Sequence, residues 1–316
     1  MEPITETTLD VTKIEPKRKH PLIFEMFDAL NPGQTLIIFN DHDPKPLYYQ
    51  LLAERGQVFK WQYIENGPLE WKVAITKNIN DSQETTIGEM SRADIRKIEV
   101  FKKFGIDFCC GGHKTLQEAC TEKGLDIHQI EAELKQNSGN SSQHLAYDEW
   151  QLDFLCEYIV QRHHNYIRKQ IPELLELSKK VMQVHANSHK ELIALNSLIE
   201  TLTSELSAHI KKEEVVLFPY IKQIEIADKT GEALPFPSFG SVHTPINMMI
   251  MEHESAGEIL EEMSITTNRY SLPEDACNSY RYLFSLIQQF EDDLKLHIHL
   301  ENNILFPKAL EIEKKF

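Results

Sequence analysis

The sequence predicts a multi-domain, mainly helical protein whose C-terminal half is a four-helix bundle. A helical pattern runs almost unbroken from Ala146 to the C-terminus, a 13-residue segment repeats within it, and strand-like patterns are confined to residues 35–75. We expect a flexible N-terminus at residues 1–19, a small α/β domain at 20–80, a short helical domain at 84–136 and the bundle at 144–316.

The α/β domain is predicted from alternating helical and strand-like patterns. Pro21–Leu30 reads as a helix opened by its proline, Thr35–Phe39 as a buried strand and Lys45–Glu54 as a second helix. Val58–Ile64 and Leu69–Ile75 are expected to form a hairpin around an Asn-Gly-Pro turn.

The short helical domain is interrupted by the motif Cys-Cys-Gly-Gly at residues 109–112. Adjacent side chains diverge, so we do not expect both cysteines to face one core. A helix follows closely and His113 and Lys114 are near, which predicts lowered pKa values for the thiols. These features favour redox or metal-handling chemistry for Cys109 and Cys110, with two buried structural cysteines as the alternative.

A polar linker, Gln136–Gln143, precedes four long helical patterns at about 147–184, 189–225, 244–266 and 273–312. Proline is expected in the first turn of the third and fourth helices, where its missing N–H costs nothing. Four antiparallel helices of this length can bury a core without help from other elements.

The repeat within the bundle carries candidate metal ligands. Residues 207–219 and 295–307 match at His, Ile, Glu, Leu, Phe and Pro with a constant offset of 88 residues. Each copy contains His-x-x-x-Glu, in one case His209 with Glu213 and in the other His297 with Glu301. Positions i and i+4 share one helix face, so we expect each pair to bind one metal from one helix.

Two further histidines lie at matching intervals. His164 lies 45 residues before His209, and His253 lies 44 residues after it. In an up-down bundle this spacing places one histidine per helix at one level. Four imidazoles and two carboxylates suit two iron ions with open positions for a small molecule. His163 adjoins His164, and the 45-residue interval favours His164.

Other polar residues near these positions have competing interpretations. Glu205 and Glu252 lie close to predicted ligands and could hold an imidazole or relay a proton, with an exposed helix carboxylate as the alternative. His299 is on the wrong helix face to join the site, and His185 and His189 are expected at the surface.

Composition limits the partners. The formal net charge is −16, and an acidic surface repels phosphate backbones, so we expect no nucleic acid. We expect no membrane span, because no apolar run approaches about 18 residues. Five cysteines without framework spacing and an N-terminus unlike a secretory signal predict a reducing, cytoplasmic location.

Residues 106–112 (IDFCCGG), the histidine series and the paired Leu-Phe-Pro endings together resemble the iron–sulfur cluster repair di-iron proteins. That family joins a CCGG domain to a hemerythrin-like bundle, and the resemblance covers about residues 84–312. It implies a cofactor of two non-haem iron ions and paired functional cysteines at Cys109 and Cys110. The implied ligands are His164, His209, Glu213, His253, His297 and Glu301.

The N-terminal segment, with His20-Pro21 and residues 40–47, resembles a small uncharacterised domain with a sulfur-carrier-like fold that is found fused to such proteins. His20 and His42 could bind a ligand, with turn formation as the alternative.

The resemblance implies that the protein repairs iron–sulfur clusters damaged by nitrosative or oxidative stress, donating iron to the damaged iron–sulfur proteins. A nitric oxide reductase and an O₂- or NO-binding sensor remain alternatives. The cysteine pair argues against a protein that only carries O₂ or NO, since such a carrier needs no reactive thiols. A homodimer is expected if the cysteine loop must reach another subunit.

Overall fold

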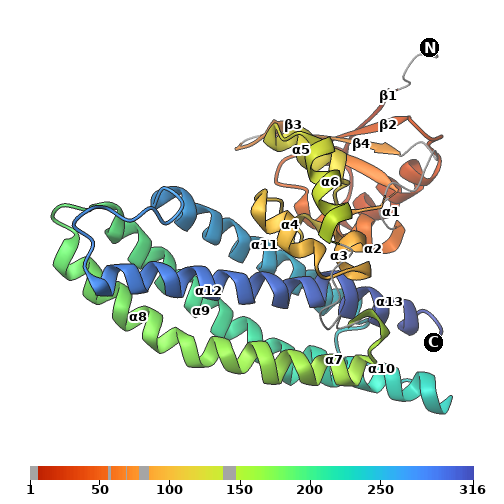
Figure 1. Cartoon of the computed structure of the whole chain (residues 1–316). Helices are drawn as coiled ribbons and strands as arrows, with labels where there is room; N and C mark the ends of the chain where they lie inside the picture. The colour runs from red at the N-terminus through yellow and green to blue at the C-terminus, as the bar shows by residue number, and fades with distance from the viewer. Residues whose placement is uncertain (1–5, 56–57, 69, 78–84, 138–146) are drawn as a thin grey trace. The chain divides into compact units, whose positions relative to one another are not determined.

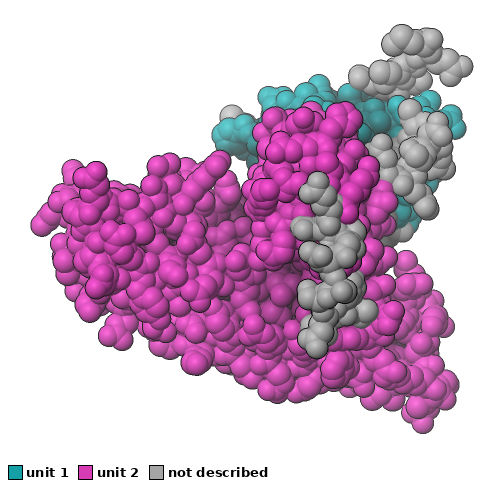
Figure 2. Space-filling model, viewed as in Figure 1, with its two compact units in different colours: residues 1–84 teal, residues 85–316 magenta. Residues whose placement is uncertain are grey.

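The computed structural model describes residues 6–55, 58–68, 70–77, 85–137 and 147–316. It divides into two compact units, residues 1–84 and 85–316, which Figure 2 colours separately. Each unit has its own hydrophobic core. Most of the predicted linker, from residue 138 to 143, lies outside the described residues.

Where its residues are described, the first unit is a four-stranded sheet in the order β1-β2-β4-β3 with two α-helices and one 3₁₀ turn. β1 pairs parallel with β2, and the other two pairings are antiparallel. Buried side chains such as Phe27 and Ile75 pack between helices and sheet. The elements are β1 (Glu6–Asp10), α1 (Pro16–Asp28), β2 (Thr35–Asn40), α2 (Lys45–Arg55), β3 (Phe59–Asn66) and β4 (Trp71–Lys77).

Two expectations for this unit were wrong. Residues 6–19 are not a flexible N-terminus, because β1 pairs along β2 and Val11 is buried. The helix begins at Pro16, so Pro21 lies inside it and does not open it. The earlier proline already supplies the residue that suits a first turn. The predicted hairpin is confirmed by the antiparallel pairing of β3 with β4.

The second unit begins with the short helices of the CCGG region. They are α3 (Ile87–Ala93), α4 (Lys97–Lys103), the 3₁₀ turn η2 (Gly111–His113), α5 (Leu116–Lys123) and α6 (Ile127–Asn137). Thr86 and Thr115 open α3 and α5 with reciprocal caps, each accepting a bond from a glutamate N–H three residues on.

The bundle follows, and Figure 1 shows its long helices running alongside one another. α8 packs against α9 and α12, and α9 packs against α11. The helices are α7 (Leu152–Ile159), α8 (Asn165–His185), α9 (Glu191–Lys212), α10 (Phe218–Thr230), α11 (His243–Thr266), α12 (Asn278–Leu300) and α13 (Phe306–Glu313).

Three of the four predicted helices are not continuous. Each contains a π-helical turn: η4 (Val160–His164), η5 (Glu213–Leu217) or η6 (Glu301–Leu305). The fourth helix also starts later than predicted, at Asn278, so Pro273 lies in the preceding loop. Proline does fall in the first turn of α11, as predicted. In the part of the chain that the structure describes, no helix is long and apolar enough to cross a membrane.

Candidate metal centre

The three π turns coincide with predicted ligands. His164 ends η4, Glu213 begins η5 and Glu301 begins η6. A π turn widens the helix locally and is common at functional sites, because it redirects a side chain. Proline follows η5 and η6 as the second residue of α10 and α13. It has no N–H to donate to the preceding turn, so the repeated Leu-Phe-Pro ending tolerates the irregular backbone.

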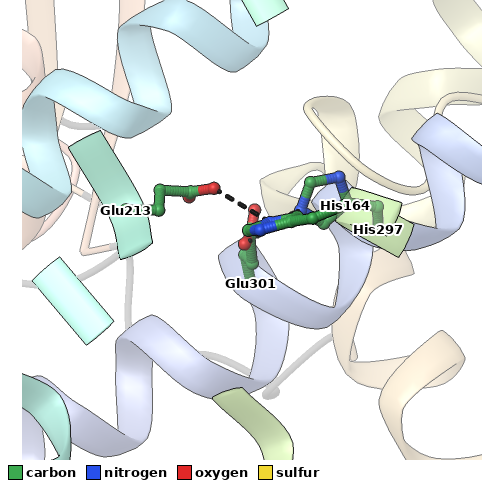
Figure 3. Close-up of side chains that lie close together, drawn as sticks. All are labelled: His164, Glu213, His297 and Glu301. Carbon is green, nitrogen blue, oxygen red and sulfur yellow. Dashed lines mark hydrogen bonds and ion pairs between the residues drawn. The ribbon is translucent and has the colours of Figure 1, made fainter. Parts of the chain in front are cut away.

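All six predicted ligands are buried and converge on one region of the bundle. Figure 3 shows four of them extending toward one another: His164 from η4, Glu213 from η5, and His297 and Glu301 from the continuous stretch of α12 and η6. His164 Nε2 lies 3.1 Å from His297 Nε2. In the second histidine pair, His253 Nε2 lies 3.0 Å from His209 Nε2. Two nitrogens that bind one ion at about 2.1 Å and at a right angle lie roughly 3.0 Å apart.

The two glutamates stand between the histidine pairs. Glu213 places one oxygen 3.3 Å from His164 Nε2 and the other 3.3 Å from His209 Nε2. Glu301 does the same, at 3.0 Å from His297 and 3.2 Å from His253. Both carboxylates therefore belong to both groups that could hold a metal ion.

This sharing extends the expectation that each His-x-x-x-Glu pair binds one metal: each pair stays together in one group, and each glutamate also belongs to the other group. One group consists of His164 and His297 with both glutamates, and the other of His209 and His253 with both glutamates. Helical spacing brings each histidine near its own glutamate. A carboxylate has two oxygens, however, so it can also reach the histidine on a neighbouring helix.

The donor set fits two divalent cations. Both oxygens of Glu213 and Oε2 of Glu301 are buried and have no hydrogen-bond partner among the described residues. Removing such a carboxylate from water costs several kcal/mol unless a positive charge compensates it. Imidazole nitrogens and carboxylate oxygens together suit iron, which offers redox and Lewis-acid chemistry when bound.

Protons on the histidines can also compensate the negative charge of these buried carboxylates. Burial disfavours the imidazolium of His209, but the Glu213 carboxylate outweighs burial and raises the pKa of His209 to about 10. Burial likewise opposes ionisation of Glu301, yet the charge of His297 holds the pKa of that carboxyl well below its usual range. Protons and metal ions therefore compete for the same nitrogens.

Hydrogen bonds to the far ring nitrogen orient three of the four histidines. Such a partner accepts the Nδ1–H and leaves the Nε2 lone pair for a metal. The pairs are His164 with Glu214 at 2.8 Å, His209 with Glu252 at 2.9 Å and His253 with Asn302 at 2.9 Å. The sequence predicts Glu252 as such a partner but not Glu214 or Asn302. Glu214 directly follows the predicted ligand Glu213, and Asn302 directly follows Glu301. That adjacency is the sequence signal for both.

Glu205 does not take part in this arrangement. It is exposed on α9 and accepts a bond from Ser255 Oγ at 3.4 Å, so the alternative of an exposed helix carboxylate describes it. His163 is buried beside the site with Nδ1 3.1 Å from Asp293 and belongs to neither metal group. His299 packs against Phe108 and belongs to neither metal group.

The two cysteines lie closer together than expected. Their Sγ atoms are 3.9 Å apart, because Asp107 accepts bonds from both backbone N–H groups and curls the chain into a tight turn. Cys109 is buried and its Sγ donates to Asp107 Oδ1 at 3.1 Å. Cys110 Sγ lies 3.4 Å from the carbonyl oxygen of His253, so the motif contacts a helix of the metal centre.

The expectation of a lowered thiol pKa was wrong for Cys109. Its hydrogen bond with Cys110, burial and the Asp107 carboxylate all raise the pKa of the Cys109 thiol. The predicted positive neighbours do not act on it. Burial lowers the pKa of His113 and disfavours its charged form, and Lys114 pairs with Glu122.

Asn303 explains why position 112, the second glycine of the motif, has no room for a side chain. A Cβ at Gly112 would lie 2.7 Å from Asn303 Oδ1, and one at Gly88 would lie 2.3 Å from it. The asparagine fills the slot between these glycines and donates to the carbonyl of Phe108 at 3.3 Å. The CCGG region is therefore fixed on η6 by the residue after Asn302.

Comparisons with known proteins agree with this architecture. Residues 157–309 match the hemerythrin HHE cation binding domain. Residues 83–138 match a domain of unknown function, DUF542, and residues 8–77 match the uncharacterized conserved protein family DUF2249.

Relatives named iron-sulfur cluster repair protein YtfE align over most of the chain. The Edwardsiella ictaluri protein is 36% identical over 228 residues, which is 72% of this chain and 97% of that protein. The Musicola paradisiaca protein is 37% identical over 231 residues, 73% of this chain and 98% of that protein. For Escherichia coli O8 the identity is 36% over 231 residues, 72% of this chain and 97% of that protein.

The chain belongs to the YtfE family of iron-sulfur cluster repair proteins. The resemblance predicted from the CCGG motif and the histidine series is thereby confirmed. Membership implies a di-iron centre, and the two buried His/Glu groups could hold its two ions.

The N-terminal unit, which matches the DUF2249 family, brings His20 and His42 to one small cavity. This cavity, of about 50 Å³, lies at the carboxyl end of β2 and is also lined by Asn40. His42 is 68% exposed and contacts Asp41, while Asp43 caps α2 by accepting the N–H of Lys45. These contacts support turn formation for this segment, as the alternative interpretation predicted.

Proposed function

We propose that this protein repairs iron–sulfur clusters damaged by nitrosative or oxidative stress by donating iron to the damaged proteins. The observation that carries the proposal is the pair of buried His/Glu groups that share Glu213 and Glu301, in a chain of the YtfE family. The proposed ligands are His164, His209, Glu213, His253, His297 and Glu301.

The donor set favours release of iron over permanent storage. Two carboxylates neutralise only part of the charge of two ferrous ions, and the four imidazoles are neutral when they bind metal. We infer that this centre releases ferrous iron more readily than a carboxylate-rich cage would, because its two carboxylates leave part of the charge of the ions uncompensated. The pKa of His209, raised to about 10 by Glu213, adds a proton that competes for its site.

We further propose that Cys109 and Cys110 receive iron on its way out. Cys110 Sγ lies 3.4 Å from the backbone carbonyl of His253, beside the proposed centre. Asp107, Cys109 and Cys110 form a third group whose donor atoms are close enough for one ion. Transfer as Fe²⁺ needs no electron, and binding releases thiol protons to solvent.

The test is reactivation of a [4Fe–4S] dehydratase that has been inactivated by nitric oxide or peroxide. Anaerobic, iron-loaded protein is expected to restore its activity in proportion to the iron lost from the donor. Glu213→Gln protein is expected to restore none, and Cys110→Ser protein is expected to act more slowly. No recovery with a fully loaded preparation would reject the proposal.

Nitric oxide or O₂ is proposed as a small ligand of the same centre. Two imidazoles and two carboxylate oxygens per ion leave coordination positions open on iron. Steady conversion of nitric oxide to nitrous oxide with an electron donor would instead indicate a reductase. Reversible binding that is unaffected by loss of both cysteines would indicate a sensor.

A homodimer and a cytoplasmic location remain predictions. The cysteine loop does not need a second subunit to reach the proposed centre, because Cys110 contacts the His253 helix within the same unit. Sedimentation of the iron-loaded protein tests the dimer, and cell fractionation tests the location.

A further inference from the structure

A continuous series of aromatic side chains leads from the metal centre to the protein surface. It starts at His297, a proposed ligand, and passes through His163 and Tyr158 to Tyr147 and Trp150. His297 and His163 are buried, whereas Tyr158 and Trp150 are half-buried. The aromatic series therefore connects the interior of the bundle with solvent.

Each ring of the aromatic series contacts the next. The imidazoles of His297 and His163 are stacked, with an interplanar angle of 5° and centroids 5.6 Å apart. The centroids of His163 and Tyr158 are 5.8 Å apart, and those of Tyr158 and Trp150 are 5.0 Å apart. These separations are those of aromatic rings in van der Waals contact. An electron can move between rings that are this close without any movement of the backbone.

His163 is fixed in the position that joins the metal centre to Tyr158. Its Nδ1 lies 3.1 Å from Asp293 Oδ2, and this contact holds the ring parallel to that of His297. Its Nε2 is buried and has no hydrogen-bond partner among the described residues. Because His163 belongs to neither metal group, its place between His297 and Tyr158 gives this buried histidine a role that metal binding does not.

Tyr158 has the chemistry of an electron donor. A phenol can give up one electron together with its proton, and it then becomes a phenoxyl radical. The Tyr158 hydroxyl lies 3.2 Å from the hydroxyl of Tyr147, which can donate a hydrogen bond to the phenoxyl oxygen. Burial raises the pKa of the Tyr147 phenol, so Tyr147 keeps the proton that it donates.

We propose that Tyr158 gives an electron to the metal centre when peroxide reacts there with a single ferrous ion. Peroxide needs two electrons to become two water molecules, and one Fe²⁺ supplies only one. As the O–O bond breaks and Fe²⁺ is oxidised to Fe³⁺, Tyr158 loses the second electron and its phenolic proton. That proton and one proton from solvent complete the two waters. The proposal rests on iron at the centre and not on iron donation by the protein.

This electron protects the ligands from oxidation. Without Tyr158, the second oxidising equivalent of peroxide stays at the centre as a hydroxyl radical, and the imidazoles nearest to the iron are its first targets. Trp150 contacts Tyr158 and is half-buried, so a small reductant such as ascorbate can reach its ring. Through this ring the reductant returns one electron to Tyr158, and the proton that the reductant loses restores the phenol.

The test uses the full chain loaded with iron, oxidised to the ferric form and then reduced by one electron per centre. One equivalent of hydrogen peroxide is added, and the sample is frozen at once for EPR spectroscopy. The parent should show a tyrosyl radical. Tyr158→Phe should lose this signal and should show more oxidised His297 in peptide mass spectrometry. Tyr282→Phe, which changes an exposed tyrosine of α12, is the matched control and should behave as the parent does.

Two further variants separate electron transfer from packing. Tyr147→Phe keeps its ring but removes the hydrogen bond, so the radical should form with a shifted g tensor. Trp150→Phe also keeps an aromatic ring, and ascorbate should then remove the radical more slowly. Thermal unfolding should show that all variants are folded.

Iron content and iron oxidation state are measured in the same samples. A radical that persists unchanged in Tyr158→Phe would overturn the proposal. Absence of a radical in the parent after its ferrous iron has been oxidised would overturn it as well, and so would a parent that binds no iron. Reactivation of a damaged dehydratase by protein that has not met peroxide tests iron donation separately.

Discussion

Asn302 accepts the Nδ1–H of His253 at 2.9 Å, and the next residue, Asn303, fills the slot between Gly88 and Gly112. One turn of π helix therefore holds a proposed metal ligand with one side chain and the CCGG motif with the next. The close approach of Cys110 to the His253 backbone follows from this arrangement.

Asn302→Ala should weaken iron binding without unfolding the protein. His253 would lose the partner that fixes its tautomer and ring orientation, and such losses typically cost 10- to 100-fold in affinity, so a value in roughly that range is expected. Competition with a ferrous chelator measures the effect. Asn165→Ala, on an exposed face of α8, should behave as the parent does. Equal affinities in both variants would contradict the role given to Asn302.

Gly112→Ala should destabilise the contact between the CCGG region and η6. The new Cβ would lie 2.7 Å from Asn303 Oδ1, and overpacking of this kind costs about 1–3 kcal/mol. Urea unfolding measures the loss, and faster alkylation of Cys110 should accompany it. Adding Asn303→Ala removes the clashing atom, so the double variant should lose less than the sum of the two single effects. If the two losses in unfolding free energy add strictly, the side chains at positions 112 and 303 do not contact each other.

Glu213→Gln and His164→Ala should differ in how many iron ions they lose. Glu213 belongs to both metal groups, whereas His164 belongs to one. We therefore expect iron to fall close to zero in Glu213→Gln and to about half of the parent value in His164→Ala. Iron analysis with Mössbauer spectroscopy measures this. His128→Ala, an exposed histidine, serves as the control. Equal losses in the two variants would argue against shared glutamates.

The metal-free protein should lose stability as pH rises above neutrality. Glu213 raises the folded-state pKa of His209 to about 10, against about 6.5 in an unfolded chain, so the folded state binds more protons between these values. This contribution is fully present below about pH 6.5 and is lost as pH rises through about 10. Urea unfolding should show a fall of up to about 3 kcal/mol between about pH 7 and about pH 9.

The iron-loaded protein provides the control for this pH dependence. Its metal ions replace the proton on His209, so its free energy of unfolding should change much less over the same range. A parallel fall in both forms would assign the effect to groups other than His209.

The residues of the two His/Glu groups were predictable because they follow helical geometry. The 88-residue repeat and the 44- and 45-residue intervals identified side chains that the structure brings together, since one turn position recurs on each helix. The sharing of Glu213 and Glu301 could not be predicted in this way. It depends on the lateral distance between helices, which sequence spacing along one helix does not contain.

The other features that the sequence did not predict also depend on tertiary contacts. The π turns have no strong local pattern, so the sequence predicts ordinary helix at η4, η5 and η6. β1 is a polar pentapeptide that becomes a strand because it pairs with β2. The pKa of the Cys109 thiol is raised because its hydrogen bond with Cys110, its burial and Asp107 all depend on the folded loop, while Lys114, close in sequence, pairs with Glu122.

Under the proposed function, the shared glutamates would also determine the order in which the two ions leave. Two cations held by the same pair of carboxylates would repel each other, so the first would depart more readily than the second. Both carboxylates would then serve the ion that stays, which would be bound more tightly. A protein with the proposed function would therefore release one iron ion at a time and keep a half-filled site ready to bind the next.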